Sequence, residues 1–431
     1  MDRARVWQDL LDHTAPTFTR PAFRLFARIA SGWILCPARR TIIGIIPTAD
    51  PQRTCAHDAF HRFFRDAVWR SWQLWRQIAL QIVGLCPESV PLALLVDDTI
   101  VHKTGPEVED AGVFRDPIRS TSRNIVYAFG LNVVLLCVRL RLPVIPQPLA
   151  LAVDLRIYRK GGPSHVALAA DMVRQLAGWL PLHRFLLIGD GAYASLAKQD
   201  LPRTHVVSRL RRDAALFDLP PPRQPGQPGR PRKKGARLPS LARIAAQATP
   251  TKWTPVHVRL RNRMVPRQLF TRTVLWYQVT GPLPIRLVTV RDPSGHEHDD
   301  YFFTTDINAR PADVAADYGD RWAIEVTFRD AKQLLGVHQP QSWRRGGPER
   351  TVMVGFWLHS AVWLWFLHTW DHNRAWPDRP WYTRKCSPSF ADALTELRAV
   401  LWHERLSPAS AASPDIAKLI RSLVASLARA G

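Results

Sequence analysis

The stretch that decides the fold is PLALLVDDTIVHKTG, residues 91–105, in which an apolar run leads directly into two acids. Leu92 to Val96 is short, apolar and preceded by a proline, which is typical of a buried strand. We expect Asp97 and Asp98 to end that strand. Strand ends are where α/β folds collect their ligand sites, although a single acid there is more often a helix cap or a turn residue.

A second stretch, HRFLLIGDGAYAS at residues 183–195, has the same arrangement. Phe185 to Ile188 predicts another buried strand, with Asp190 at its carboxyl end. Gly191 then opens a turn into a helical stretch over about residues 192–199. Two acids that follow two strands indicate an α/β domain with its functional site at those strand ends.

The third stretch is YGDRWAIEVTFRDAK, residues 318–332, which holds Tyr318, Arg321, Glu325 and Lys332. If this segment is one α-helix, a turn of about 100° per residue places all four on a stripe about 60° wide. A carboxylate can hold a metal ion, and Arg, Lys and Tyr can hold phosphate oxygens. The combination suits metal-assisted chemistry on a polyanion, whereas the ordinary alternative is a solvated charged face.

Taken together, the three stretches resemble the DDE transposases of bacterial insertion sequences. The spacing of the four residues on the stripe matches that family's Y-x2-R-x3-E-x6-K signature, VDDT is similar to its first acidic motif, and IGDGAY to its second. The resemblance covers about residues 20–370. It implies an RNase H-like catalytic domain, a divalent-metal nuclease and strand-transfer activity, and the carboxylate triad Asp97, Asp190 and Glu325.

The first acid of that triad has two candidates. Members of the family usually show Asp, one variable residue, then Thr or Ser, which selects Asp97; Asp98 is the alternative, because adjacent side chains of a strand point to opposite faces. The resemblance implies two Mg²⁺ ions, for which Mn²⁺ can substitute, held by the three acids. Such a pair of ions activates the attacking oxygen and stabilises the leaving oxygen.

The resemblance also implies residues that grip DNA phosphates beside the scissile bond. Tyr318, Arg321 and Lys332 have this role in the signature, and Arg329 falls near the same stripe. The expected partner is double-stranded DNA, as terminal inverted repeats and as target, with a homodimer bringing two ends together. The alternative function is a catalytically inactive RNase H-like DNA-binding protein derived from a mobile element.

Composition agrees with a nucleic-acid partner. The chain has 431 residues, a formal net charge of +23 and 59 Lys and Arg against 36 Asp and Glu, a balance that favours a polyanion. Its five cysteines are scattered without a C-x-x-C pair, so neither a zinc site nor a disulfide framework is indicated. The first residues do not resemble a signal peptide, and we expect a bacterial cytoplasmic, nucleoid-associated protein.

We expect an α/β fold with an RNase H-like mixed sheet flanked by helices and interrupted by an antiparallel β insert. Five regions are predicted: an N-terminal helical region that is a candidate for DNA binding (1–90), the first catalytic part (91–213), a basic Pro/Gly loop with the β insert (214–308), the second catalytic part with the signature (309–385) and a helical tail (386–431).

Two segments have alternative interpretations. The loop PPPRQPGQPGRPRKKG, residues 220–235, is rich in Pro and Gly and contains Lys233 and Lys234; it either lies along DNA phosphates or is a solvated linker. Val352 to Trp370 is apolar and close to membrane-spanning length. Its histidines and serine favour a buried core helix behind the signature segment, and we expect no association with a membrane.

Overall fold

A computed structural model of the protein describes most of the chain. The described residues are 2–116, 119–121, 123–143, 145–223, 229–260, 263–371, 385, 387–410 and 414–430, with the side chains of 407–410 and 414–415 not described. The sequence prediction for the loop 220–235 therefore falls partly outside them, at residues 224–228.

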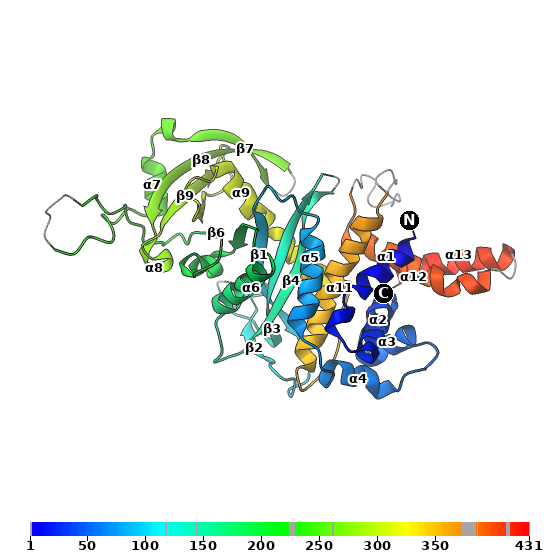
Figure 1. Ribbon diagram of the computed structural model, residues 1–431. Helices are drawn as coiled ribbons and strands as arrows, with labels where there is room; N and C mark the ends of the chain where they lie inside the picture. Colours follow the sequence, from blue (N-terminus) through cyan, green and yellow to red (C-terminus); the bar gives the residue numbers. More distant parts are fainter. Residues whose placement is uncertain are drawn as a thin grey trace.

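One ten-stranded sheet organises the molecule (Figure 1). Its strand order is β2-β3-β1-β5-β6-β10-β9-β8-β7, and β4 also pairs with β3. The strands are β1 (Leu92–His102), β2 (Gly112–Arg115), β3 (Tyr127–Leu142), β4 (Ile145–Tyr158), β5 (Phe185–Gly189), β6 (Thr204–Arg209), β7 (Thr254–Leu260), β8 (Arg263–Leu275), β9 (Pro284–Arg291) and β10 (Asp300–Thr304).

The central strands have the connectivity of an RNase H-like domain. Strands β1, β3 and β4 pair in an antiparallel manner, while β5 lies parallel to β1 and β6 lies parallel to β5. The crossover from β4 to β5 is a helix, α6 (His165–Trp179), as a parallel connection requires. The predicted fold class is confirmed: helices flank a mixed sheet.

Strand β1 is longer than the sequence predicts. Asp97 and Asp98 do not end it, because both remain in the antiparallel ladder with β3, opposite Leu135 and Val134, and the strand continues to His102. The pairing partner, which is 16 residues long, extends the ladder past the two acids. The first acidic motif therefore lies in the middle of a strand, where the backbone fixes the direction of each side chain.

The predicted antiparallel insert is present and belongs to the same sheet. Strands β7 to β10 form a meander in which each neighbour is antiparallel. Strand β10 then pairs with β6, with Phe302 opposite Arg209. Because β6 neighbours β5, the insert continues the catalytic sheet, and we call β7–β10 the sheet extension.

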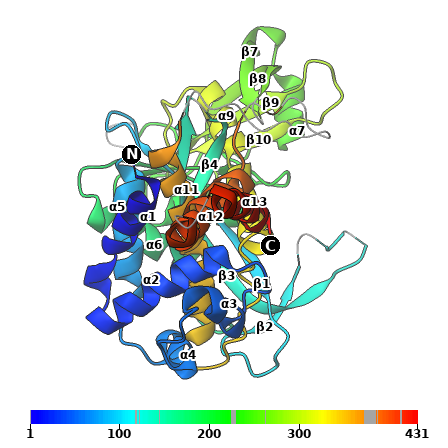
Figure 2. The same cartoon turned by 90° about the vertical axis from the view of Figure 1, so that its right-hand side faces the viewer.

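Helices cover both faces of the sheet. The N-terminal region is helical as predicted, and its helices α1 and α2 pack against α12 near the C-terminal end of the chain (Figure 2). The helices not yet named are α1 (Arg3–Asp12), α2 (Arg20–Leu35), α3 (Ile42–Ala49), α4 (His57–Arg65), α5 (Ser71–Val83), α7 (Leu241–Gln247), α8 (Tyr277–Thr280), α9 (Pro311–Asp320), α10 (Trp322–Gln333), α11 (Gly347–Thr369), α12 (Phe390–Ser410) and α13 (Pro414–Arg429).

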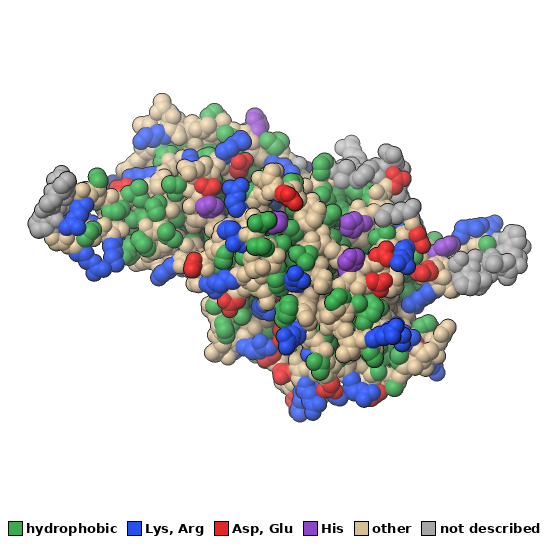
Figure 3. Space-filling view, viewed as in Figure 1, with side chains coloured by type: hydrophobic (Ala, Val, Ile, Leu, Met, Phe, Trp, Pro, Cys, Tyr) green, Lys and Arg blue, Asp and Glu red, His purple; other side chains and the backbone are tan. Residues whose placement is uncertain are grey.

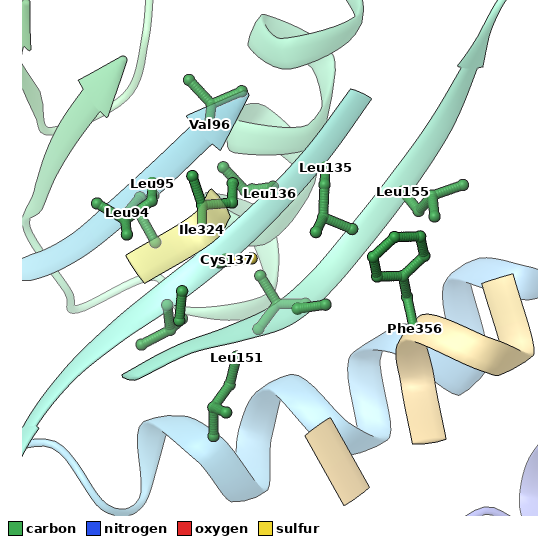
Figure 4. Packing of buried hydrophobic residues seen from close by; sticks show 14 of the residues in the cluster. Leu94, Leu95, Val96, Leu135, Leu136, Cys137, Leu151, Leu155, Ile324 and Phe356 are labelled. Atoms are coloured by element: carbon green, nitrogen blue, oxygen red, sulfur yellow. The ribbon is translucent and has the colours of Figure 1, made fainter. Parts of the chain in front are cut away.

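The apolar helix α11 forms part of the core. By length and composition it could cross a membrane, but 89% of its most apolar window is buried inside the protein. Its Ser360 hydroxyl donates to the carbonyl of Ala152 on β4, and Phe356 packs beside Leu155 (Figure 4). The prediction of a core helix is confirmed, because the sheet and neighbouring helices surround it.

Candidate active site

The parallel pair β1 and β5 brings two of the predicted acids side by side. Val96 is paired with Gly189, so the next residue of each chain segment is an acid, Asp97 on β1 and Asp190 just past β5. Asp190 Oδ1 accepts a hydrogen bond of 2.8 Å from the backbone N–H of Ala192. It thereby caps a short 3₁₀ helix, η2 (Gly191–Lys198), where the sequence predicted helical structure.

The signature segment is two helices, not one. Helix α9 ends at Asp320, α10 begins at Trp322, and Arg321 joins them. The backbone N–H of Ile324 donates to the carbonyl of Arg321 at 3.1 Å, a spacing of three residues, which is the tighter pattern of helix ends. The prediction of a single helical stripe was wrong at this junction, although side chains from both helices still face the strand-end acids.

Arg321 connects the first and third acids of the predicted triad. Its Nη1 donates to Asp97 Oδ2 at 2.6 Å and its Nη2 donates to Glu325 Oε1 at 2.7 Å. Asp97 is largely enclosed, and burial raises the pKa of its carboxyl to about 7, with Arg321 opposing the rise and Asp190 adding to it. The Arg321 guanidinium therefore joins Asp97 and Glu325, and Asp190 lies at the neighbouring strand end beside Asp97.

The other signature residues lie at the edges of this arrangement. Lys332 Nζ donates to Thr99 Oγ1 at 2.6 Å, two residues beyond Asp97 on β1, and burial lowers its pKa to about 8. The ring of Tyr318 contacts that of Phe302, with centroids 4.4 Å apart, and the Arg321 guanidinium lies 5.7 Å from the Tyr318 ring. Lys332 therefore contacts β1, and Tyr318 contacts β10 of the sheet extension.

Three predicted phosphate-binding residues lie elsewhere or have other contacts. Arg329 is exposed and pairs with its neighbour Asp330 at 3.0 Å. Lys233 is exposed, and Lys234 Nζ lies 4.1 Å from the ring centroid of Phe217 and 5.4 Å from that of Tyr277. Lys234, at the described end of the basic loop, therefore lies against the aromatic rings of Phe217 and of Tyr277 in α8 (Tyr277–Thr280).

Asp98 has a different environment from Asp97. The hydroxyl of Tyr193 donates to Asp98 Oδ1 at 3.0 Å, and His165 Nε2 lies 3.9 Å from Asp98 Oδ2. Burial raises the pKa of the Asp98 carboxyl. Sequence reasoning assigned no role to Tyr193, although its place three residues after Asp190 in IGDGAY was the available signal.

The donor set fits a hard cation such as Mg²⁺, which prefers carboxylate oxygens. In the part of the chain that is described, no three His, Cys, Asp or Glu side chains converge closely enough to hold a metal ion together. Positive charge is nevertheless already placed between two of the acids, because the Arg321 guanidinium bridges Asp97 and Glu325. In this structure the guanidinium neutralises these two carboxylates.

Two family models match the chain. The family model described as DDE superfamily endonuclease matches residues 14–282, more than half of the chain. The model of archaeal transposases of type ISC1217 matches residues 275–345. The first match contains Asp97 and Asp190 and the second contains Glu325. Among curated proteins, none matches the chain.

Proposed function

Because the chain belongs to the DDE superfamily of endonucleases and transposases, we propose that it cuts the ends of an insertion sequence and joins them to target DNA. The observation that carries this proposal is the Arg321 bridge between Asp97 and Glu325. It brings an acid from a β-strand and an acid from a distant helix to one point beside Asp190. An accidental charged face would not be aimed at a buried strand.

Asp97, Asp190 and Glu325 are the proposed ligands of Mg²⁺, and Mn²⁺ is the expected substitute. When bound, a pair of such ions supplies an activated oxygen nucleophile and stabilises the leaving oxygen of the phosphodiester. The contacts of the two acids favour Asp97 as the metal ligand on β1. Asp97 and Glu325 both bind Arg321, whereas Asp98 accepts a hydrogen bond from Tyr193.

Phosphate binding falls to the cationic residues around the acids. Arg321 has a planar fork that suits a phosphate as well as a carboxylate, so a DNA phosphate at the site competes with Asp97 and Glu325 for it. Lys332 supplies a point charge at the other end, beside Thr99. We propose that DNA draws Arg321 away from the two acids and frees them for the metal.

The proposed partners follow from the charge and the reaction. Lys and Arg side chains are spread over the viewed face from the sheet extension to the N-terminal helices (Figure 3), in keeping with the net charge of +23 and with a long polyanion as partner. Double-stranded DNA serves as terminal inverted repeat and as target. Joining two ends requires both in one complex, and a homodimer meets that requirement.

A cleavage assay on DNA carrying the element's ends tests the function. Glu325→Gln should abolish Mg²⁺-dependent cleavage and leave end binding nearly unchanged, because the amide keeps the shape of the side chain but removes its charge. Asp313→Asn, which alters an exposed acid of the neighbouring helix α9, is the matched control and should cleave like the unmodified protein. Full cleavage by Glu325→Gln would reject the proposed triad, and a wild-type protein that binds ends without cutting would favour the inactive DNA-binding alternative.

A further inference from the structure

A second polar cluster lies on the opposite face of β1 from Arg321, and no step of the proposed reaction uses it. It consists of Asp98, Tyr193, His165 and Tyr158. We propose that Tyr193, through its hydrogen bond to Asp98, is a positioning residue that fixes Asp190 relative to Asp97. This inference rests on the proposed function, since it concerns two of the proposed metal ligands.

The first step is the direction of the side chains on β1. Successive residues of a strand point to opposite faces, and Asp97 and Thr99 both contact residues of the signature segment, Arg321 and Lys332. Asp98 lies between them in sequence and contacts Tyr193 instead. The two acids therefore serve different sides of the sheet.

The second step is the link from Tyr193 to Asp190. Tyr193 belongs to η2, the 3₁₀ helix that Asp190 caps, and its backbone N–H donates to the carbonyl of Asp190 at 3.1 Å. The Asp190 carbonyl also accepts from Ser208 Oγ at 2.6 Å. A side chain that anchors η2 thus anchors the backbone that carries the Asp190 carboxylate.

The third step is how tightly Tyr193 is placed. Its side chain is buried, with 1% exposed. A Cβ on Gly189 would lie only 2.8 Å from the Tyr193 Cβ, so glycine at that position gives the ring room to approach β5. With the ring fixed in this way, its hydroxyl can tie η2 to β1 at a single point, the Asp98 carboxylate.

The Asp98 carboxylate has a hydrogen bond at one oxygen and a His165 nitrogen 3.9 Å from the other. Oδ1 accepts from Tyr193 and Oδ2 faces His165, whose ring stacks on that of Tyr158 with centroids 4.0 Å apart. An asparagine at position 98 could keep the hydrogen bond from Tyr193, because its side-chain oxygen accepts from the hydroxyl. The same change at a metal-ligating carboxylate should weaken binding of the cation, because the amide oxygen carries no net charge.

The test measures Mn²⁺ affinity of the full chain without DNA, by calorimetry. Tyr193→Phe should weaken Mn²⁺ binding about tenfold, the scale on which groups supporting a metal ligand act. Asp98→Ala should weaken it to the same extent, and the double variant should be no worse than either single variant. Asp98→Asn should bind nearly as well as the unmodified protein, whereas Asp97→Asn should lose far more affinity.

Controls separate positioning from general damage. Thermal unfolding shows whether each variant folds, and Tyr127→Phe, which removes an exposed hydroxyl from β3, should leave Mn²⁺ affinity unchanged. Unaltered affinity in folded Tyr193→Phe overturns the inference. So does an Asp98→Asn variant as damaged as Asp97→Asn, which would make Asp98 a ligand. If Asp97→Asn, Asp190→Asn and Glu325→Gln all retain Mn²⁺ affinity, the proposed function itself fails.

Discussion

At the residue scale, Arg321 joins distant parts of the candidate site, because its guanidinium binds Asp97 of β1 and Glu325 of α10. The three acids were predicted from strand ends and from the resemblance, and two of them, Asp97 and Glu325, contact the Arg321 guanidinium. The bridge from Arg321 to Asp97 joins residues 224 positions apart. No spacing rule along a chain indicates such a contact, because it depends on how distant elements pack.

Lys332 should set the upper pH limit for binding DNA ends. Burial lowers its pKa to about 8, so in the free protein it is charged below that pH and loses its proton as pH rises through it. End affinity should therefore fall between about pH 8 and 9.5. Lys332→Arg should remove most of the fall, because arginine stays charged throughout this range.

Fluorescence anisotropy with labelled end DNA at constant salt measures this effect. The comparison is the slope of affinity against pH in the two proteins, not the affinity at one pH, since arginine also changes the geometry of the contact. Equal slopes for lysine and arginine would assign the pH dependence to another group.

At the scale of elements, the differences from prediction arise where partners override local signals. Strand β1 continues past its two acids because β3 pairs with it there, and a polar pair alone predicts the opposite. The break between α9 and α10 is likewise invisible to helical periodicity. Just before it, Asp317 and Asp320 of α9 bind Arg139 and Arg141 of β3, with oxygen–nitrogen distances of 2.6 to 3.4 Å.

This ion-pair cluster should hold α9 in place, and with it the start of the signature. The Asp320 side chain is 5% exposed and contacts Arg139, Arg141 and Arg259 of β7. Asp320→Ala should lower the free energy of unfolding by about 3 kcal/mol, because it removes a buried carboxylate that three guanidinium groups share and leaves the buried Arg139 with Asp317 alone.

Urea unfolding provides the measurement. The matched control is Glu107→Ala, which breaks an exposed pair with Arg344 whose side chains are 60% and 71% exposed; it should cost less than about 1 kcal/mol. Equal losses for the two variants would show that the cluster around Asp320 contributes no more than a surface pair.

At the scale of the whole molecule, the helical N-terminus and the apolar helix were both predicted, but their association was not. Amphipathic patterns show that a face is buried and do not name its partner. The Trp33 indole N–H of α2 donates to the Leu335 carbonyl at 2.7 Å, just past α10, and the Trp365 indole of α11 donates to the Arg3 carbonyl at 2.9 Å. The N-terminal helices thus share a core with the catalytic region.

Removal of residues 1–90 should therefore yield an insoluble or molten fragment and not an independent catalytic domain. The deletion uncovers the apolar helix α11, because α11 contacts α1, α4 and α5. A large exposed apolar surface promotes aggregation. Expression of residues 91–431 followed by sedimentation and circular dichroism tests this. A soluble fragment with a cooperative thermal transition would show that the N-terminal helices are a separate module.

The pairing of β10 with β6 has a consequence for anyone who wishes to recombine such proteins. Strand β6 lies next to β5, which leads into Asp190, and β10 closes the meander just before the chain enters α9. A hybrid protein that takes β7–β10 from a relative must also keep the backbone hydrogen bonds between β10 and β6. A junction between β6 and β10 would disrupt the sheet beside the second acid. Junctions are better placed near β7 and β8, at the edge of the sheet farthest from the acids.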